Sequence, residues 1–110
     1  MNQTELNNFA REHFDTYKKR QEGHIVHDPG TTLAHRTLVE KICEWAHIKG
    51  YLFFTRVYLK NGHIADICIP ELKQPFIEVR SSEEKKEKEY LAEYRVRVQF
   101  VDVSDPFKLL

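Results

Sequence analysis

The sequence has 110 residues, of which 41% are hydrophobic and 31% charged, and its 17 basic side chains balance its 17 acidic ones. This length and composition predict a single globular domain with a modest core and exclude a disordered chain. Zero net charge gives no global electrostatic argument for nucleic-acid binding, so any such binding must depend on local basic patches.

The two cysteines, Cys43 and Cys68, fall in predicted core segments far apart in the sequence. We expect buried free thiols of an intracellular protein, ahead of a disulfide or a metal site. No apolar run is long enough to span a bilayer, and the polar N-terminal residues do not resemble a signal peptide. The sequence therefore predicts a cytoplasmic protein without membrane contacts.

The N-terminal segment, residues 1–30, predicts one helix followed by an extended lead-in. Thr4 can cap a helix that runs to about Arg20. The apolar residues of this helix fall at helical spacing and form one stripe: Leu6, Phe9, Ala10, Phe14 and Tyr17. His24 and His27 are spaced for a shared metal ion, but no further ligand stands nearby, so we expect an extended segment.

The next helix has the clearest signals in the chain. Thr31 or Thr32 can cap it, and the pattern predicts a helix over Leu33–Lys49 that ends at Gly50. Its predicted apolar face contains Ala34, Leu38, Val39, Ile42, Trp45 and Ala46. His35 falls near the middle of this face. A lone inward histidine is more often a hydrogen-bonded core residue than a ligand.

Three strands are expected after this helix. Tyr51–Leu59 is rich in aromatic and β-branched residues, and Asn61-Gly62 predicts a type I′ hairpin turn into the next strand. The second and third strands are His63–Ile69 and Phe76–Arg80, which are separated by a loop bounded by prolines.

Asp66 and Glu78 are carboxylates inside two predicted core strands, where buried charges need a partner or a metal ion. An antiparallel pairing of the two strands places Asp66 about opposite Glu78. Because side chains alternate along a strand, Glu78 and Arg80 share a face with Phe76, whereas Ile77 and Val79 share the other. The alternative is that Glu78 and Arg80 simply form an ion pair, with Asp66 capping a turn.

The C-terminal part predicts a helix from Ser81 or Ser82 to about Tyr94 and then a fourth strand, Arg95–Val103. A strand–helix–strand connection of this length implies a parallel, right-handed crossover. In the strand, apolar residues alternate with polar ones: Val96, Val98 and Phe100 against Arg97 and Gln99. Residues 104–110 form an apolar tail that packs on its own domain or forms a homodimer contact.

The expected core, residues 31–103, has the order αβββαβ around a mixed four-stranded sheet. With Asp66 on the second strand and Glu78-Val79-Arg80 on the third, it resembles the PD-(D/E)XK nuclease superfamily, which has the restriction-endonuclease-like fold. Within that superfamily, His35-Arg36-x-Leu38-Val39 is similar to the Holliday-junction resolvase helix that begins with an acidic residue. His24-x-x-His27, followed by His35 and then Glu-Val-Arg-Ser-Ser, is more similar to the competence-protein CoiA-like nucleases.

The resemblance implies a DNA endonuclease that hydrolyses phosphodiester bonds with a metal-activated water. Asp66, Glu78 and the backbone carbonyl of Val79 would hold Mg²⁺ or Mn²⁺, without a small-molecule cofactor. Arg80 stands where the family usually has lysine. Arginine cannot act as a general base, although it can clamp phosphate oxygens. His35 could then act as the base, or as a metal ligand in place of the family's helix carboxylate.

Binding of duplex or branched DNA would use phosphate contacts from Arg56, Lys60, Lys85 and Lys86. The alternative function is a catalytically inactive nuclease-like module that binds nucleic acid or a protein partner. A third is a small structural protein that dimerises through its apolar tail.

Overall fold

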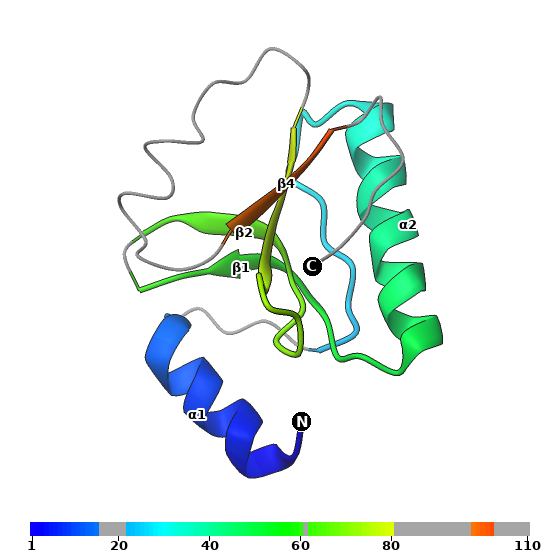
Figure 1. The fold of residues 1–110 in the computed structure, drawn as a ribbon. Helices are drawn as coiled ribbons and strands as arrows, with labels where there is room; N and C mark the ends of the chain where they lie inside the picture. Colours follow the sequence, from blue (N-terminus) through cyan, green and yellow to red (C-terminus); the bar gives the residue numbers. More distant parts are fainter. Residues whose placement is uncertain (16–21, 61, 81–97, 103–110) are drawn as a thin grey trace.

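The computed structural model of the protein describes residues 1–15, 22–60, 62–80 and 98–102 (Figure 1). Within these ranges the chain forms, in order, α1 (Gln3–His13), α2 (Leu33–Lys49), β1 (Phe54–Tyr58), β2 (Ile64–Cys68), β3 (Phe76–Arg80) and β4 (Val98–Asp102).

The four strands form one mixed sheet in the order β1-β2-β3-β4. The pairings of β1 with β2 and of β2 with β3 are antiparallel, and β4 pairs with β3 in parallel. The protein therefore has an α+β fold, as we expected, and the described elements are compatible with the order αβββαβ. The helix expected from Ser81 or Ser82 to Tyr94 lies outside the described residues.

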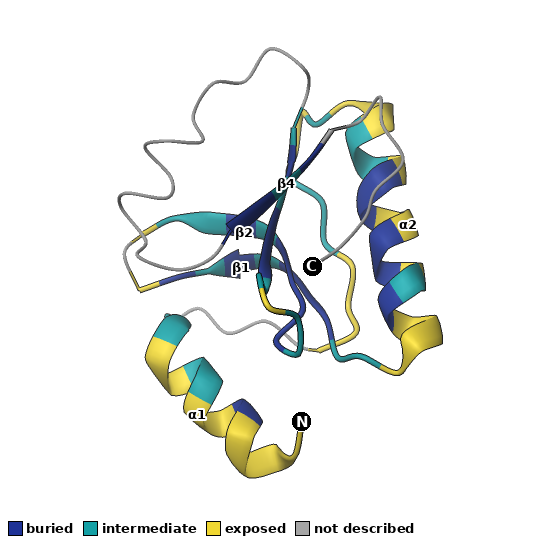
Figure 2. Cartoon of the chain, viewed as in Figure 1, coloured by how far each residue is buried: buried dark blue, intermediate teal, exposed yellow. Residues whose placement is uncertain are grey.

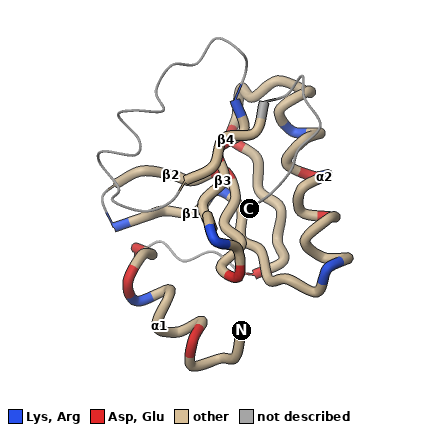
Figure 3. The backbone as a smooth tube through the Cα atoms, viewed as in Figure 1, with Lys and Arg blue, Asp and Glu red and all other residues tan. Residues whose placement is uncertain are grey.

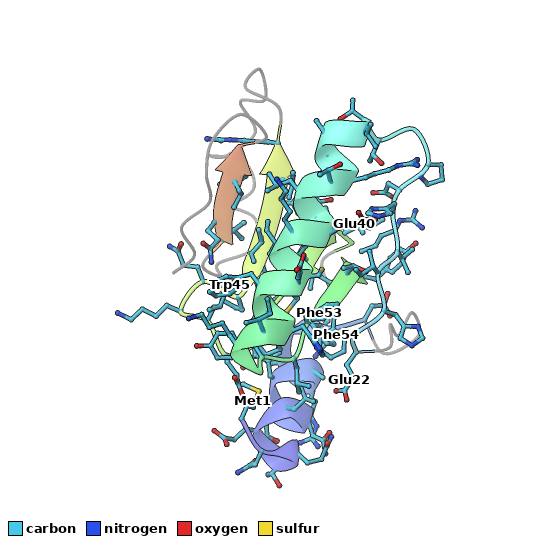
Figure 4. All side chains as sticks on the ribbon, turned by 90° about the vertical axis from the view of Figure 1, so that its right-hand side faces the viewer. Met1, Glu22, Glu40, Trp45, Phe53 and Phe54 are labelled. Carbon is cyan, nitrogen blue, oxygen red and sulfur yellow. The ribbon has the colours of Figure 1, made fainter. Side chains whose placement is uncertain are left out.

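The helix α2 has the expected bounds because both of its ends are capped locally. The hydroxyl of Thr32 accepts a hydrogen bond from the His35 backbone, and Gly50 adopts the left-handed conformation that favours glycine. The inward face of α2 packs on one face of the sheet (Figures 2 and 4). Its buried residues are Leu38, Val39, Ile42, Cys43 and Ala46. Ala34 was expected on this face but is exposed.

The helix α1 is shorter than expected and has a different cap. Asn2, not Thr4, caps it, and the side chain of Glu5 completes a reciprocal capping box. The helix ends at His13, not near Arg20, because Phe14 is extended and bridges to Leu59 of the β1–β2 hairpin. A second apolar cluster joins α1 to the sheet face opposite α2 (Figure 1): Leu6, Phe54, Val57, Leu59, Ala65, Cys68, Phe76 and Val98.

The β1–β2 connection differs from the expected two-residue turn. Leu59 donates its N–H to the His63 carbonyl, and Gly62 donates to the Leu59 carbonyl. Three residues therefore separate the paired positions Leu59 and His63, and Gly62, with φ 91°, occupies the last of them. Glycine at positive φ is typical of a three-residue hairpin loop with a bulge.

The strand β4 is buried on both sides, which its alternating pattern did not predict. Gln99 is only 7% exposed, next to buried Val98 and Val101. Its side-chain amide donates a 2.6 Å hydrogen bond to the Gln74 carbonyl, in the β2–β3 loop. This bond satisfies a polar group that would otherwise be costly to bury.

Several expected features lie outside the described residues. They include the apolar tail of residues 104–110 and the two lysines Lys85 and Lys86. Neither described helix combines the length and the apolar character that a membrane crossing requires.

Candidate functional site

The strands β2 and β3 separate at the point where the two carboxylates stand. Ile67 pairs with Ile77 and Cys68 with Phe76, so continuing this register by one residue places Asp66 opposite Glu78. At this position, hydrogen bonds from backbone N–H groups to side chains replace the backbone–backbone hydrogen bonds between the two strands. The Asp66 N–H donates to Glu78 Oε1 at 3.3 Å, and the Val79 N–H donates to Asp66 Oδ2 at 2.9 Å. The two carboxylates therefore meet at the register that the sequence predicts.

His35 reaches the same position from the first turn of α2. Its Nε2 lies 3.3 Å from Asp66 Oδ2, and the two side chains are only 19% and 16% exposed. The hydrogen bond to Asp66 raises the pKa of His35. The charges of Asp66 and Asp28 and the backbone of Val79 raise it further, against the lowering effect of burial.

The other ring nitrogen of His35, Nδ1, is buried and has no hydrogen-bond partner within the described part of the chain. A buried nitrogen of this kind is costly unless a further group meets it. Its environment distinguishes His35 from the ordinary hydrogen-bonded core histidine that its position alone suggests.

Arg80 lies apart from His35. Phe76 belongs to the apolar cluster on the α1 side of the sheet, and Ile77 and Val79 belong to the cluster beneath α2, as the expected alternation requires. The Arg80 guanidinium sits 4.9 Å from the centre of the Phe100 ring, which packs against the α1-side cluster. The structure thus brings His35 to the Asp66 carboxylate and Glu78 to the Asp66 backbone, while Arg80 lies on the Phe100 ring on the α1 side of the sheet.

Two of the four basic residues expected to contact DNA lie in the described part of the chain. Lys60 is exposed at the end of the β1–β2 hairpin. Arg56 is half-buried: its guanidinium forms an ion pair with Asp28 and lies 5.9 Å from the centre of the Tyr58 ring. Figure 3 shows acidic and basic residues spread over both helices and the strands, in keeping with the zero net charge.

Asp28 is a site residue that the sequence reasoning missed. It belongs to the Asp-Pro-Gly turn before α2, it contacts Arg56, and its charge acts on His35. Its carbonyl accepts hydrogen bonds from the backbone and hydroxyl of Thr31, which fix the turn. The turn motif could have indicated this ordering, but not the partner on β1.

His24 and His27 do not form part of a group of three metal ligands within the described residues. His27 Nε2 lies 3.3 Å from Glu40 Oε1 on α2, and Figure 4 shows Glu40 on that helix. Nowhere in the described ranges do three His, Cys, Asp or Glu side chains group as a ready-made metal site. A Mg²⁺ ion needs fewer side chains, because it commonly keeps several waters and binds one or two carboxylates.

The two cysteines are buried and free, as the sequence predicts. Burial raises the pKa of Cys43 to about 12 and that of Cys68 well above its usual range. Since the thiolate is the reactive form, neither thiol suits nucleophilic catalysis.

No protein-family model, curated protein or solved structure shows significant similarity to this chain. The case for a function therefore depends on the chemistry of the residues around Asp66. That chemistry consists of two anchored carboxylates, a half-buried imidazole and an ion-paired arginine.

Proposed function

We propose that the protein is a metal-dependent nuclease of the PD-(D/E)XK type, which hydrolyses DNA phosphodiester bonds with Mg²⁺ or Mn²⁺. One observation carries the proposal: Asp66 and Glu78 meet where β2 and β3 separate, and each accepts a hydrogen bond from the other strand's backbone. A divalent cation at this point would offset the negative charge that the two carboxylates bring to neighbouring strands. Such an arrangement suits a divalent metal ion.

The donor atoms fit the proposed metal in chemical class. Mg²⁺ and Mn²⁺ prefer hard oxygen ligands, and Asp66, Glu78 and the Val79 carbonyl supply three. The Val79 N–H and His35 both engage Oδ2 of Asp66; within the described residues, its Oδ1 accepts no hydrogen bond. When bound there, the ion would polarise the scissile phosphate and acidify a water molecule.

His35 can serve in either of two ways. Its raised pKa favours the imidazolium form, which partly neutralises Asp66. To accept a proton from water, or to ligate a metal, it must first lose that proton. Arg80 cannot be a base, because arginine keeps its proton at accessible pH.

Phosphate contacts from Arg56 and Lys60, and from Lys85 and Lys86 outside the described residues, would hold duplex or branched DNA. The proposal also includes a cytoplasmic location.

A homodimer through the 104–110 tail is an additional proposal, and sedimentation of a chain ending at Asp105 tests it. An unchanged oligomeric state would count against that role of the tail.

Cleavage assays test the nuclease proposal. Plasmid, single-stranded and branched DNA should be cut in the presence of Mg²⁺ or Mn²⁺, and not with a chelator. Asp66→Asn and Glu78→Gln should each reduce the rate by at least about a hundredfold, since a lost ligand impairs both metal binding and charge stabilisation. Glu44→Gln, on the exposed side of α2, is the matched control and should cut normally. Full activity in both site variants would disprove the proposed site.

A catalytically inactive module is the second candidate, and one observation favours it. His35 and the Val79 N–H already engage Oδ2 of Asp66 without a metal ion. This candidate predicts that calorimetry detects no divalent-metal binding at Asp66. It also predicts that nucleic acid or a protein partner binds equally well to the Glu78→Gln variant.

A further inference from the structure

Arg56 has an unusual backbone for a residue in a strand. Its φ is 47°, the only positive φ among the described residues other than glycine. Side chains with a Cβ disfavour this region, and residues held there concentrate at functional sites. Nothing about the pairing of β1 with β2 accounts for it, because the register is the same on both sides of Arg56.

This residue stands beside Asp66 on the neighbouring strand. Thr55 pairs with Ile67 and Val57 with Ala65, so Arg56 occupies the β1 position opposite Asp66. A basic residue on the neighbouring strand therefore lies next to Asp66, where the proposed scissile phosphate would bind. Arg80, by contrast, lies on the Phe100 ring.

In the protein without nucleic acid, Asp28 Oδ1 forms an ion pair with Nε of the Arg56 guanidinium. Both side chains are partly exposed, at 27% for Arg56 and 37% for Asp28, although the Arg56 Nε that contacts Asp28 is itself buried. The segment that carries Asp28 is anchored to β1 next to Arg56. Thr55 Oγ1 accepts from the Val26 N–H and donates to the His24 carbonyl, both at 2.7 Å. Asp28 is also close enough to raise the pKa of His35.

We propose that Arg56 binds the phosphate of the nucleic acid at the Asp66–Glu78 site, and that Asp28 is an internal competitor that this phosphate displaces. The inference rests on the proposed function, because it assumes a nucleic-acid phosphate at that site. Carboxylates and phosphates are both anionic acceptors for a guanidinium, so the negative charge of Asp28 at Arg56 Nε opposes the binding of a phosphate to the same group. The contact with Asp28 is then autoinhibitory and weakens binding.

A double-mutant cycle on binding tests the proposal. The probe is a short fluorescein-labelled DNA duplex, and anisotropy is measured in chelator so that cleavage cannot interfere. Asp28→Asn should tighten binding about three- to tenfold, because it removes a negative charge that competes with the phosphate for Arg56. Arg56→Gln should weaken binding and lower the salt slope by about one phosphate contact. In the Arg56→Gln background, Asp28→Asn should have little remaining effect.

Two further variants make the test specific. Glu44→Gln removes the same charge from the exposed side of α2, and it should change binding less than Asp28→Asn does. Arg56→Gly removes the side chain while accepting the positive φ, so it should weaken binding in a chain that folds as stably as wild type. Unchanged or weaker binding by Asp28→Asn would overturn the inference. So would tightening that Glu44→Gln reproduces or that persists without Arg56.

The experiment separates this inference from the nuclease proposal. Coupling between Asp28 and Arg56, in a protein that never cuts DNA with metal, would support the inference and contradict the nuclease. Cleavage that depends on Asp66, without coupling between Asp28 and Arg56, would support the nuclease proposal and contradict the inference. A wild-type chain that binds no DNA would overturn both.

Discussion

At the scale of single residues, opposing effects meet at His35. Burial disfavours its charged form, whereas the hydrogen bond to Asp66 and the nearby negative charges favour it, and the favourable effects prevail. The pKa of His35 in the folded protein therefore lies above the ordinary histidine value of 6.5. By linkage, the charged contact stabilises the fold fully below the unfolded pKa, and the stabilisation is lost as pH rises through the folded value.

We therefore expect His35→Gln to destabilise the protein more at about pH 5.5 than at about pH 9, by roughly 0.5–1 kcal/mol. Urea denaturation of both proteins at the two pH values measures the difference. His47→Gln, at an exposed position of α2, is the control and should show much less pH dependence. A penalty that grows toward high pH would contradict the assigned direction of the shift.

The sequence was sufficient to place Asp66 opposite Glu78, because strand alternation and one loop determine that register. It was not sufficient to predict that Arg56 and Asp28 contact each other beside the site. Their contact joins residues 28 positions apart, and neither the positive φ of Arg56 nor its partner has a local signal. The same holds for Gln99, whose burial depends on a carbonyl in another loop.

At the scale of elements, α2 could be predicted to the residue and α1 could not. The ends of α2 depend on local groups, the Thr32 hydroxyl and the left-handed Gly50. The end of α1 depends on tertiary contacts. Phe14 bridges to Leu59, and the Asp15 N–H donates to the Tyr58 carbonyl, so the chain leaves the helix to join the hairpin. An apolar stripe continuing to Tyr17 cannot reveal that competition.

Removing the cap of α2 tests the local part of this account. Thr32→Ala should lower the free energy of unfolding by about 1 kcal/mol, because the His35 N–H loses its acceptor. Thr37→Ala makes the same change at an exposed position inside the helix, and should be neutral or stabilise by a few tenths of a kcal/mol. Urea denaturation measures both. Equal effects would show that the Thr32 hydroxyl does not act as a cap.

At the scale of the whole molecule, two apolar clusters lie on opposite faces of one sheet. One joins α2 to the sheet and the other joins α1 to it. The site lies at the start of α2 and the split between β2 and β3, so the packing of α2 on the sheet fixes the distance from His35 to Asp66. Stability and site geometry are therefore coupled through this helix.

Two isoleucines in α2 test that packing. Ile42 is fully buried, so Ile42→Ala should destabilise the fold by about 2–5 kcal/mol. Ile48 is 74% exposed, so the same substitution there should change stability by less than about 0.5 kcal/mol. Thermal or urea unfolding compares them. A small penalty at Ile42 would mean that α2 does not pack as described.

The central claim is that Asp66 and Glu78 hold a divalent metal ion, and Mn²⁺ binding measured by calorimetry tests it most directly. We expect the wild-type chain to bind Mn²⁺, Asp66→Asn and Glu78→Gln to lose that binding, and Glu44→Gln to retain it. Binding should also weaken as pH falls and His35 becomes fully protonated, since the added charge opposes a cation. No Mn²⁺ binding by the wild-type protein, or equal binding by the Asp66→Asn variant, would contradict the claim.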